Sequence, residues 1–162
     1  MILIALGSNI SGPWGSPAES VQRALILLNS DGIKLVNSSR LLLTSAYGRP
    51  GQPAFVNAVA QVETHLPPLA LLQKLHALER QAGRRRALRW GPRTLDLDII
   101  DYHGLVLSRR ARLNLPHPGI ADRIFVLKPI AEIAGSWRHP VSRKSAAEML
   151  RKLKGYSQGN EI

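Results

Sequence analysis

The stretch Arg89-Trp90-Gly91-Pro92-Arg93-Thr94-Leu95-Asp96-Leu97-Asp98-Ile99-Ile100 contains two aspartates separated by a single residue. Leu95, Leu97 and Ile99 alternate with these acids, which is typical of a strand. Side chains on a strand alternate between its faces, so Asp96 and Asp98 point the same way, with Cα atoms roughly 6.5–7 Å apart. Two carboxylates at that spacing repel each other unless a cation lies between them. Mg²⁺ suits this pattern, because it binds to one or two carboxylates and completes its shell with water and phosphate oxygens.

Arginines are concentrated on the N-terminal side of this acid pair, at Arg84, Arg85, Arg86, Arg89 and Arg93. Acids that hold a metal, next to arginines that bind phosphate, favour phosphoryl-type transfer from a magnesium nucleotide. Each half of the pattern also has a simpler interpretation. Most Asp-x-Asp pairs form a solvated polar face, and most arginine runs face solvent or nucleic acid. Their combination, joined by a Trp-Gly-Pro turn, favours a functional site.

The composition is that of a globular protein. The chain has 162 residues, 44% apolar and 20% charged, which predicts a single domain over residues 1–162 with a substantial core. There are no cysteines, so disulfides and thiolate metal sites are excluded, and a reducing cytoplasm is the expected location. The N-terminus lacks the basic start of a signal peptide, and we expect no membrane span.

The formal charge of +11 indicates either a nucleic acid partner or a polyanionic substrate. Aromatic residues make up only 5% of the chain and do not interleave with the basic residues, as they would in a surface that stacks bases. We interpret the C-terminal basic block as a solvated helix face; it consists of Arg138, Arg143, Lys144, Arg151, Lys152 and Lys154.

The order of predicted elements indicates a fold class. A capping box at Ser16-Pro17-Ala18-Glu19 starts the first helix. We expect strands at residues 2–6, 33–44, 55–63 and 94–102. Helices are expected from 17 to about 30, at 67–81, at 124–133 with an interruption near Pro129, and at 145–153. The tail from residue 155 is expected to be loose. The order β-α-β-β-α-β is that of an α+β, ferredoxin-like fold with an antiparallel sheet, helices on one face, and C-terminal helical additions that cover the other.

Several motifs together resemble those of the 6-hydroxymethyl-7,8-dihydropterin pyrophosphokinase family. The longest is Arg84-x-Arg86 followed by Arg89-Trp90-Gly91-Pro92-Arg93-x-x-Asp96-Leu97-Asp98-Ile99. The others are Ala5-Leu6-Gly7-Ser8-Asn9, Phe55-Val56-Asn57-Ala58, Leu78-Glu79-x-x-x-Gly83-Arg84, Pro116-His117-Pro118 and Arg123-x-Phe125. They stand in the same order and cover most of residues 1–135. The resemblance implies transfer of diphosphate from ATP to the hydroxymethyl group of the reduced pterin, with release of AMP, in folate biosynthesis.

The resemblance also implies catalytic roles. Asp96 and Asp98 would hold two Mg²⁺ ions, and Arg84 and Arg93 would bind the phosphates. The arginine-rich segment 83–90 would close over ATP. The remaining residues implied to contact the nucleotide are His76, Glu79, Arg86, Trp90, Ile99, Arg112, His117 and Arg123. A plain surface pair is the alternative for His76 and Glu79.

For the pterin, the resemblance implies that Phe55 and Phe125 stack on the two faces of the ring. Asn57 would bond its edge through a donor and an acceptor. Thr44, Ser45 and Tyr47 lie where the family uses backbone groups, although this chain has Ser45 where the family often has proline. Core packing is the alternative for both phenylalanines.

We therefore expect a monomeric diphosphotransferase that uses ATP and Mg²⁺ and binds neither nucleic acid nor membrane. The main rival is a nucleic-acid-binding module with a ferredoxin-like sheet, which the +11 charge favours. That rival predicts exposed aromatic side chains on the sheet and indifference to Mg²⁺. An inactive relative of the family is disfavoured because every acid and arginine of the motifs is present.

Overall fold

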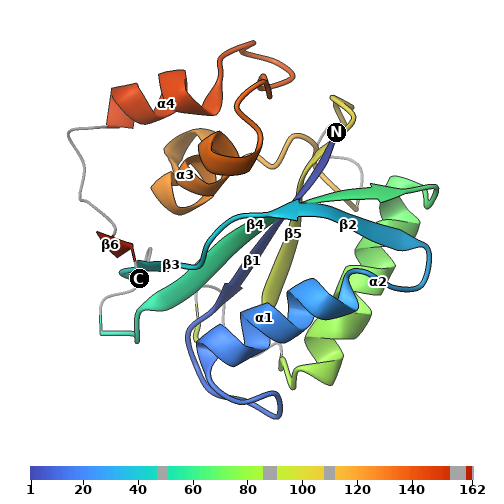
Figure 1. Cartoon of the computed structure of the whole chain (residues 1–162), viewed down its shortest axis with the longest axis vertical. Coiled ribbons are helices and arrows are strands. Elements are labelled where there is room, and N and C mark those ends of the chain that lie inside the picture. Colours follow the sequence, from blue (N-terminus) through green and yellow to red (C-terminus); the bar gives the residue numbers. More distant parts are fainter. Residues whose placement is uncertain (47–50, 86–90, 108–111, 154–159, 162) are drawn as a thin grey trace.

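The computed structural model describes residues 1–46, 51–85, 91–107, 112–153 and 160–161. Its six strands form one sheet in which β5, β1, β4, β3 and β6 are neighbours in that order and β2 also pairs with β4 (Figure 1). The strands are β1 (Ile2–Ser8), β2 (Ile33–Ser38), β3 (Leu42–Thr44), β4 (Phe55–Thr64), β5 (Asp96–Tyr102) and β6 (Asn160–Glu161). Every pairing is antiparallel. The expected α+β, ferredoxin-like arrangement is thus confirmed.

The helices begin and end close to the predicted positions. They are α1 (Pro17–Leu27), α2 (Pro68–Gln81), α3 (Ile124–Ile133) and α4 (Ala146–Leu153), with a short 3-10 helix η1 (Ile120–Asp122) before α3. The predicted capping box is present at α1: the Ser16 hydroxyl accepts from the Glu19 N–H and the Glu19 carboxylate accepts from the Ser16 N–H. Ser145 and Glu148 make the same pair of bonds at α4.

Two predictions about continuity were wrong. The expected single strand over residues 33–44 is divided into β2 and β3, because the Ser39 hydroxyl accepts from the Val59 N–H and so takes the place of a backbone partner. The expected interruption of α3 near Pro129 does not occur. The proline removes one helical hydrogen bond, but burial of the neighbouring Val126, Leu127 and Ile130 compensates for that loss.

The tail expected from residue 155 is outside the described part except for Asn160 and Glu161. These two residues differ from an unpaired tail, since they form β6 beside Leu43 and Leu42 of β3. For the remaining residues from 155 onward the prediction stays a prediction. In the part of the chain that the structure describes, no helix has the length and apolar character needed to cross a bilayer.

Helices lie on both faces of the sheet (Figure 1). On one face α1 and α2 pack against an apolar cluster that includes Ile4, Leu6, Ala60 and Leu97. On the other face α3 and α4 pack against a second cluster that contains residues from three strands: Leu3, Val59 and Ile100. The C-terminal additions therefore cover the second face, as predicted, but only over part of its length.

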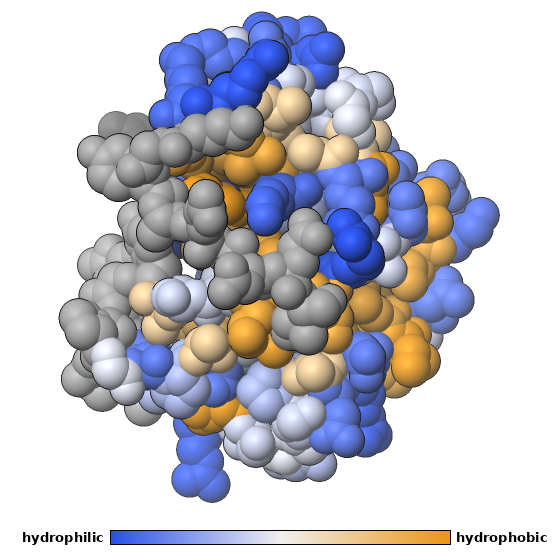
Figure 2. All heavy atoms as spheres, turned by 60° about the vertical axis from the view of Figure 1, so that its left-hand side comes forward, coloured by the Kyte–Doolittle hydropathy of each residue, from blue (hydrophilic) through white to orange (hydrophobic). Residues whose placement is uncertain are grey.

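The exposed basic side chains of the C-terminal segment gather where α4 lies. Arg151 and Lys152 are exposed on α4, and Arg138 and Arg143 are exposed before it. Figure 2 shows hydrophilic side chains over this upper part of the molecule. For these four residues the placement agrees with the interpretation of the block as a solvated surface; Lys144 is half-buried, and Lys154 lies outside the described residues.

Candidate active site

The part of the second face that α3 and α4 leave open is the floor of a pocket. The strand register places Gly7 of β1 between Asn57 of β4 and Asp96 of β5. Two residues earlier on β1, Ala5 pairs with Asp98. Small residues on the middle strand keep the floor low, while polar side chains project from the strands on either side. A Cβ added to Gly7 would lie 3.1 Å from Asn57 Oδ1, so even a methyl group crowds this floor.

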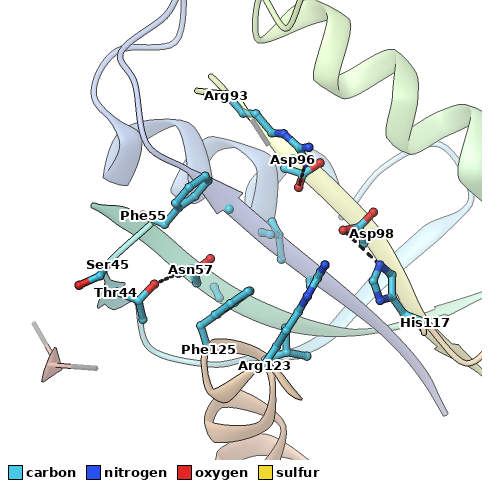
Figure 3. Close-up of a pocket in the computed structure, with 16 residues that line it drawn as sticks. Thr44, Ser45, Phe55, Asn57, Arg93, Asp96, Asp98, His117, Arg123 and Phe125 are labelled. Atoms are coloured by element: carbon cyan, nitrogen blue, oxygen red, sulfur yellow. Dashed lines mark hydrogen bonds and ion pairs between the residues drawn. The ribbon is translucent and has the colours of Figure 1, made fainter. Parts of the chain in front are cut away.

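The pocket has a volume of about 310 Å³. Its walls come from β3, β4, β5, the loop before η1 and the start of α3 (Figure 3). The lining residues are Ala5, Leu6, Gly7, Thr44, Ser45, Phe55, Asn57, Ala58, Gly91, Arg93, Asp96, Asp98, His117, Arg123, Phe125 and Val126. Residues far apart in the sequence thus converge on one cavity that is apolar at one end and charged at the other.

At the charged end, Asp96 is paired with two arginines. Arg84 Nη1 donates to Asp96 Oδ1 at 2.8 Å, and Arg93 Nη1 donates to Oδ2 at 2.5 Å. Arg84 also donates to Glu79 on α2. These are charge-assisted hydrogen bonds, which are short and strong. Both guanidinium groups are therefore held beside the acid pair at the edge of the pocket.

Asp98 faces the pocket next to His117, with Asp98 Oδ2 3.8 Å from His117 Nε2. The half-buried position of Asp98, together with the negative charge of Asp96, raises the pKa of Asp98 to about 7. Burial and the positive charge of Arg123 lower the pKa of His117 to about 4. At neutral pH the histidine is uncharged. Its Nδ1 accepts from the Gly119 N–H, so Nε2 carries the proton and can donate into the pocket.

At the apolar end, Phe55 and Phe125 lie on either side of Asn57 (Figure 3). The Asn57 amide donates from Nδ2 to Thr44 Oγ1 at 2.8 Å, which fixes the plane of the carboxamide. The Arg123 guanidinium lies 5.8 Å from the centre of the Phe125 ring and extends towards the charged end. Two aromatic rings and a fixed amide suit a flat, polar ring system.

Comparisons with known proteins identify the family of this chain. Residues 3–135 match the model of the 7,8-dihydro-6-hydroxymethylpterin-pyrophosphokinase (HPPK) family. The chain belongs to this family. A 2-amino-4-hydroxy-6-hydroxymethyldihydropteridine pyrophosphokinase from Pseudomonas aeruginosa is 43% identical over 88% of this chain and 85% of its own length. One of the same name from Haemophilus influenzae is 41% identical over 86% of this chain and 85% of its own length.

Two further proteins that this chain resembles are longer than it. A folic acid synthesis protein, fol1, from Pneumocystis carinii is 36% identical over 94% of this chain but only 20% of its own length. The crystal structure of Plasmodium falciparum HPPK-DHPS superimposes with a TM-score of 0.68 over 96% of this chain and 44% of that chain. At 13% identity, this likeness shows the fold alone. As an HPPK, the chain is an ATP-dependent pyrophosphokinase of folate biosynthesis.

The structure places most of the residues predicted for an HPPK site in the pocket. Those that line it are Thr44, Ser45, Phe55, Asn57, Arg93, Asp96, Asp98, His117, Arg123 and Phe125, and Arg84 contacts Asp96 at its edge. Tyr47, Arg86 and Trp90 lie outside the described residues, as does most of the predicted loop 83–90. Their roles stay predictions.

Four of the predicted nucleotide residues do not line this pocket. Ile99 is only 2% exposed, and its side chain packs in the α1/α2 core. Glu79 is buried behind β5, His76 is half-buried on α2, and Arg112 is exposed on the loop after residue 111. The described pocket thus contains the acid pair and the aromatic end but not these four side chains.

Asn9 supports the edge of the pocket, a role that the sequence motifs contained without indicating. Its Oδ1 accepts from the Arg93 N–H at 2.8 Å, and its Nδ2 donates to Gln52 Oε1 and to the Pro53 carbonyl, each at 3.2 Å. Asn9 is 2% exposed. It ties the end of β1 to the turn that carries Arg93 and to the segment before β4. In the sequence, the position of Asn9 as a polar residue directly after an apolar strand was the one sign that it has a structural role.

Proposed function

We propose that this chain transfers the terminal diphosphate of ATP to the hydroxymethyl group of 6-hydroxymethyl-7,8-dihydropterin in the pocket described above, giving AMP and the pterin diphosphate. The observation that supports this most strongly is the division of one cavity into two ends. Asp96, Asp98 and Arg93 lie at one end, and Phe55, Asn57 and Phe125 lie at the other. A flat pterin bound at the aromatic end directs its substituent towards the acids.

The donor set at the charged end fits Mg²⁺. Two carboxylates project from one face of β5 into a cavity of about 310 Å³. Among the described residues, no group of three or more His, Cys, Asp or Glu side chains is placed to enclose a metal by itself. Mg²⁺ is usually held by one or two carboxylates and by the substrate's phosphates, so this incomplete set is appropriate. We assign Asp96 and Asp98 as ligands of two Mg²⁺ ions, which would neutralise phosphate charge during transfer.

Arg84 and Arg93 would bind the phosphates. Both oxygens of Asp96 are now occupied by these arginines, so the guanidinium groups are already concentrated beside the acid pair. Polyphosphate oxygens are equally good acceptors for them and carry more charge. When ATP takes over these hydrogen bonds, Asp96 becomes available as a ligand. The arginines then stabilise charge on the transferred group and its leaving group.

The pterin hydroxyl loses a proton as it attacks. Asp98 faces the pocket and would help to accept that proton; as a ligand of Mg²⁺ its carboxylate would be ionised in the loaded enzyme. His117, uncharged and with its proton on Nε2, would donate a hydrogen bond to a phosphate oxygen. Stacking between Phe55 and Phe125 and a hydrogen bond to Asn57 would hold the ring for in-line attack.

Calorimetric titration with ATP, with and without Mg²⁺, followed by mass analysis of the products formed from ATP and the pterin, tests this proposal. We expect Mg²⁺-dependent ATP binding and equal amounts of AMP and pterin diphosphate. Binding that ignores Mg²⁺, or release of ADP, would contradict the assignment. The monomeric state and the cytoplasmic location stay predictions, for which sedimentation and cell fractionation are the measurements.

The nucleic-acid-binding rival receives no specific support. It requires exposed aromatic side chains on the sheet. In the described part of the chain the large hydrophobic side chains that are exposed are aliphatic or Met1, and Phe55 and Phe125 are partly buried in the pocket.

A further inference from the structure

The Glu79 carboxylate is buried on the side of β5 that faces α2. Glu79 lies in the last turn of α2 and is 6% exposed. Its Oε1 accepts from the Leu97 N–H at 2.8 Å and from Arg84 Nη1. The side chain does not line the pocket. A buried carboxylate is costly unless its partners compensate for the lost water, so these two contacts require an explanation.

The first contact fixes the strand that carries the acids. Among the described strands, β5 is at the edge of the sheet and pairs with β1 alone, so the N–H groups on its outer side need other partners. Leu97, whose N–H the Glu79 side chain accepts, is the residue between Asp96 and Asp98. Glu79 therefore holds β5 at the point where both predicted metal ligands project.

The second contact fixes a phosphate-binding arginine. Arg84 Nη1 is shared between Glu79 Oε1 and Asp96 Oδ1. The Arg84 backbone N–H also donates to the Glu79 carbonyl at 3.0 Å, across a turn in which Gly83 has a φ of 82°. Glu79 thus holds Arg84 by its main chain and by its guanidinium group.

The two contacts differ in what they require of residue 79. Any uncharged acceptor of the same shape would satisfy the Leu97 N–H, whereas a negative charge is needed to hold a guanidinium. Burial raises the pKa of Glu79, and the Leu97 N–H and the positive charge of Arg84 oppose that shift. An uncharged amide would accept from the Leu97 N–H with a smaller desolvation penalty than a carboxylate. The charge of Glu79 must therefore serve its second contact, the one with Arg84.

We propose that Glu79 is a positioning residue for diphosphate transfer: it does not touch ATP but holds Arg84 beside Asp96, oriented for the phosphates. This inference rests on the proposed function of the pocket. It differs from the direct nucleotide contact that the family resemblance implied for Glu79.

A double-mutant cycle separates the two roles. Glu79→Gln keeps an acceptor for the Leu97 N–H but removes the charge that holds Arg84. We expect kcat to fall about tenfold or more while the KM for ATP changes by less than about threefold. In the Arg84→Met background the same substitution should change kcat by less than about twofold, because the residue through which Glu79 acts is already absent. Glu63→Gln, which removes an exposed carboxylate from β4, is the matched control and should leave kcat unchanged.

Equal falls in kcat in both backgrounds, or a rise confined to the KM for ATP, would overturn the proposal, as would a normal kcat in a folded Glu79→Gln protein. If Glu79→Gln does not fold, Glu79→Asp replaces it in the cycle. The shorter carboxylate keeps its charge but cannot reach both partners, so the same coupling to Arg84 is expected and its absence is equally decisive.

Nuclear magnetic resonance of arginine side chains provides a readout without substrate. The Arg84 guanidinium signals should show restricted rotation in the free wild-type protein and lose it in Glu79→Gln. If the wild-type protein produced no AMP but kept these restrained signals, the proposed function would fail while the contact between Glu79 and Arg84 stood. Unrestrained signals in the wild type would remove the basis of the positioning role.

Discussion

The two faces of the sheet differ in how far their apolar surface extends. On the face that packs against α1 and α2, apolar side chains continue along the strands from one end to the other, as in Ile2, Ile4 and Leu6 of β1. On the opposite face of the same strand the sequence runs from Leu3 through Ala5 to Gly7. The first of these packs against α3 and α4, and the last two form the pocket floor.

The same change occurs on the neighbouring strands. On β5, Ile100 packs under the C-terminal helices whereas Asp96 and Asp98 face the pocket. On β4, Val59 is in the core whereas Asn57 and Phe55 line the cavity. Alternation along one strand thus lets adjacent residues serve stability and chemistry separately. Substitutions of adjacent residues on β5 test this separation.

The largest effect is expected for Asp98→Asn. The substitution keeps the shape of the side chain but removes a charge that the reaction requires. Loss of a preorganised charge contact in a transition state costs about 3–4 kcal/mol, so turnover should fall about 10²–10³-fold while the protein stays folded. Steady-state release of AMP together with circular dichroism measures both. Near-normal turnover in the folded variant would remove Asp98 from the mechanism and weaken the comparison of the two faces.

Leu97→Ala should have the opposite profile. Leu97 is 1% exposed and belongs to the α1/α2 core, so its truncation leaves a cavity that costs about 2–5 kcal/mol of unfolding free energy. The backbone N–H that contacts Glu79 remains. At a temperature where the variant is still folded, kcat should stay within a few-fold of the wild-type value. Urea denaturation measures the loss, with Leu69→Ala, an exposed position on α2, as the control. A stable but inactive Leu97→Ala protein would show that residues on the core face also determine catalysis on the pocket face.

How much of this arrangement the sequence predicted depends on the range of the interactions involved. Strand alternation placed Asp96 with Asp98 and Phe55 with Asn57, because side-chain direction is a local property. The same rule also places the Ile99 side chain on the core face, away from the pocket. The break near Ser39 was missed because it depends on a hydrogen bond to Val59, twenty positions away.

The pocket floor was missed for a related reason. Ala5 and Gly7 matter because the register places them between Asp98, Asp96 and Asn57, and register between distant strands cannot be read from one strand's pattern. Asn9 joins two loops for the same reason, since its partners Arg93 and Gln52 follow far along the chain. The family resemblance supplied the residue types of the site but not these cross-strand contacts.

Gly7→Ala tests whether the low floor matters, and a moderate effect is expected. The added Cβ would lie 3.1 Å from Asn57 Oδ1 and 3.7 Å from Phe55 Cδ1, so the pterin end must shift. Overpacking costs about 1–3 kcal/mol, which predicts a loss of pterin affinity of about tenfold with little change in ATP affinity. Fluorescence titration measures both. Gly135→Ala, where the nearest atom would lie 4.0 Å from the new Cβ, is the control. Equal loss of both ligands would indicate a general distortion of the sheet.

The smallest expected effect is the loss of folding stability that the ionised Asp98 carboxylate causes in the pocket. In the metal-free protein, burial and the charge of Asp96 raise the pKa of this carboxyl from 3.8 to about 7. The folded protein therefore binds a proton more tightly than the unfolded chain does. The stabilisation from Asp98 is complete below pH 3.8, declines as the pH rises from there to about 7, and is absent above that.

Asp98→Asn removes this dependence of stability on pH. With a chelator present, its melting temperature relative to that of the wild type should rise across this window and level off above pH 7. Because solvent reaches 38% of the Asp98 side chain, the gain should be small, about 2 °C by the usual scaling for a domain of this size. Leu97→Ala provides the contrast from the opposite face, since its loss of stability should be the same at every pH. If the difference in melting temperature between Asp98→Asn and the wild type did not change with pH, the pKa of Asp98 would not be raised by folding.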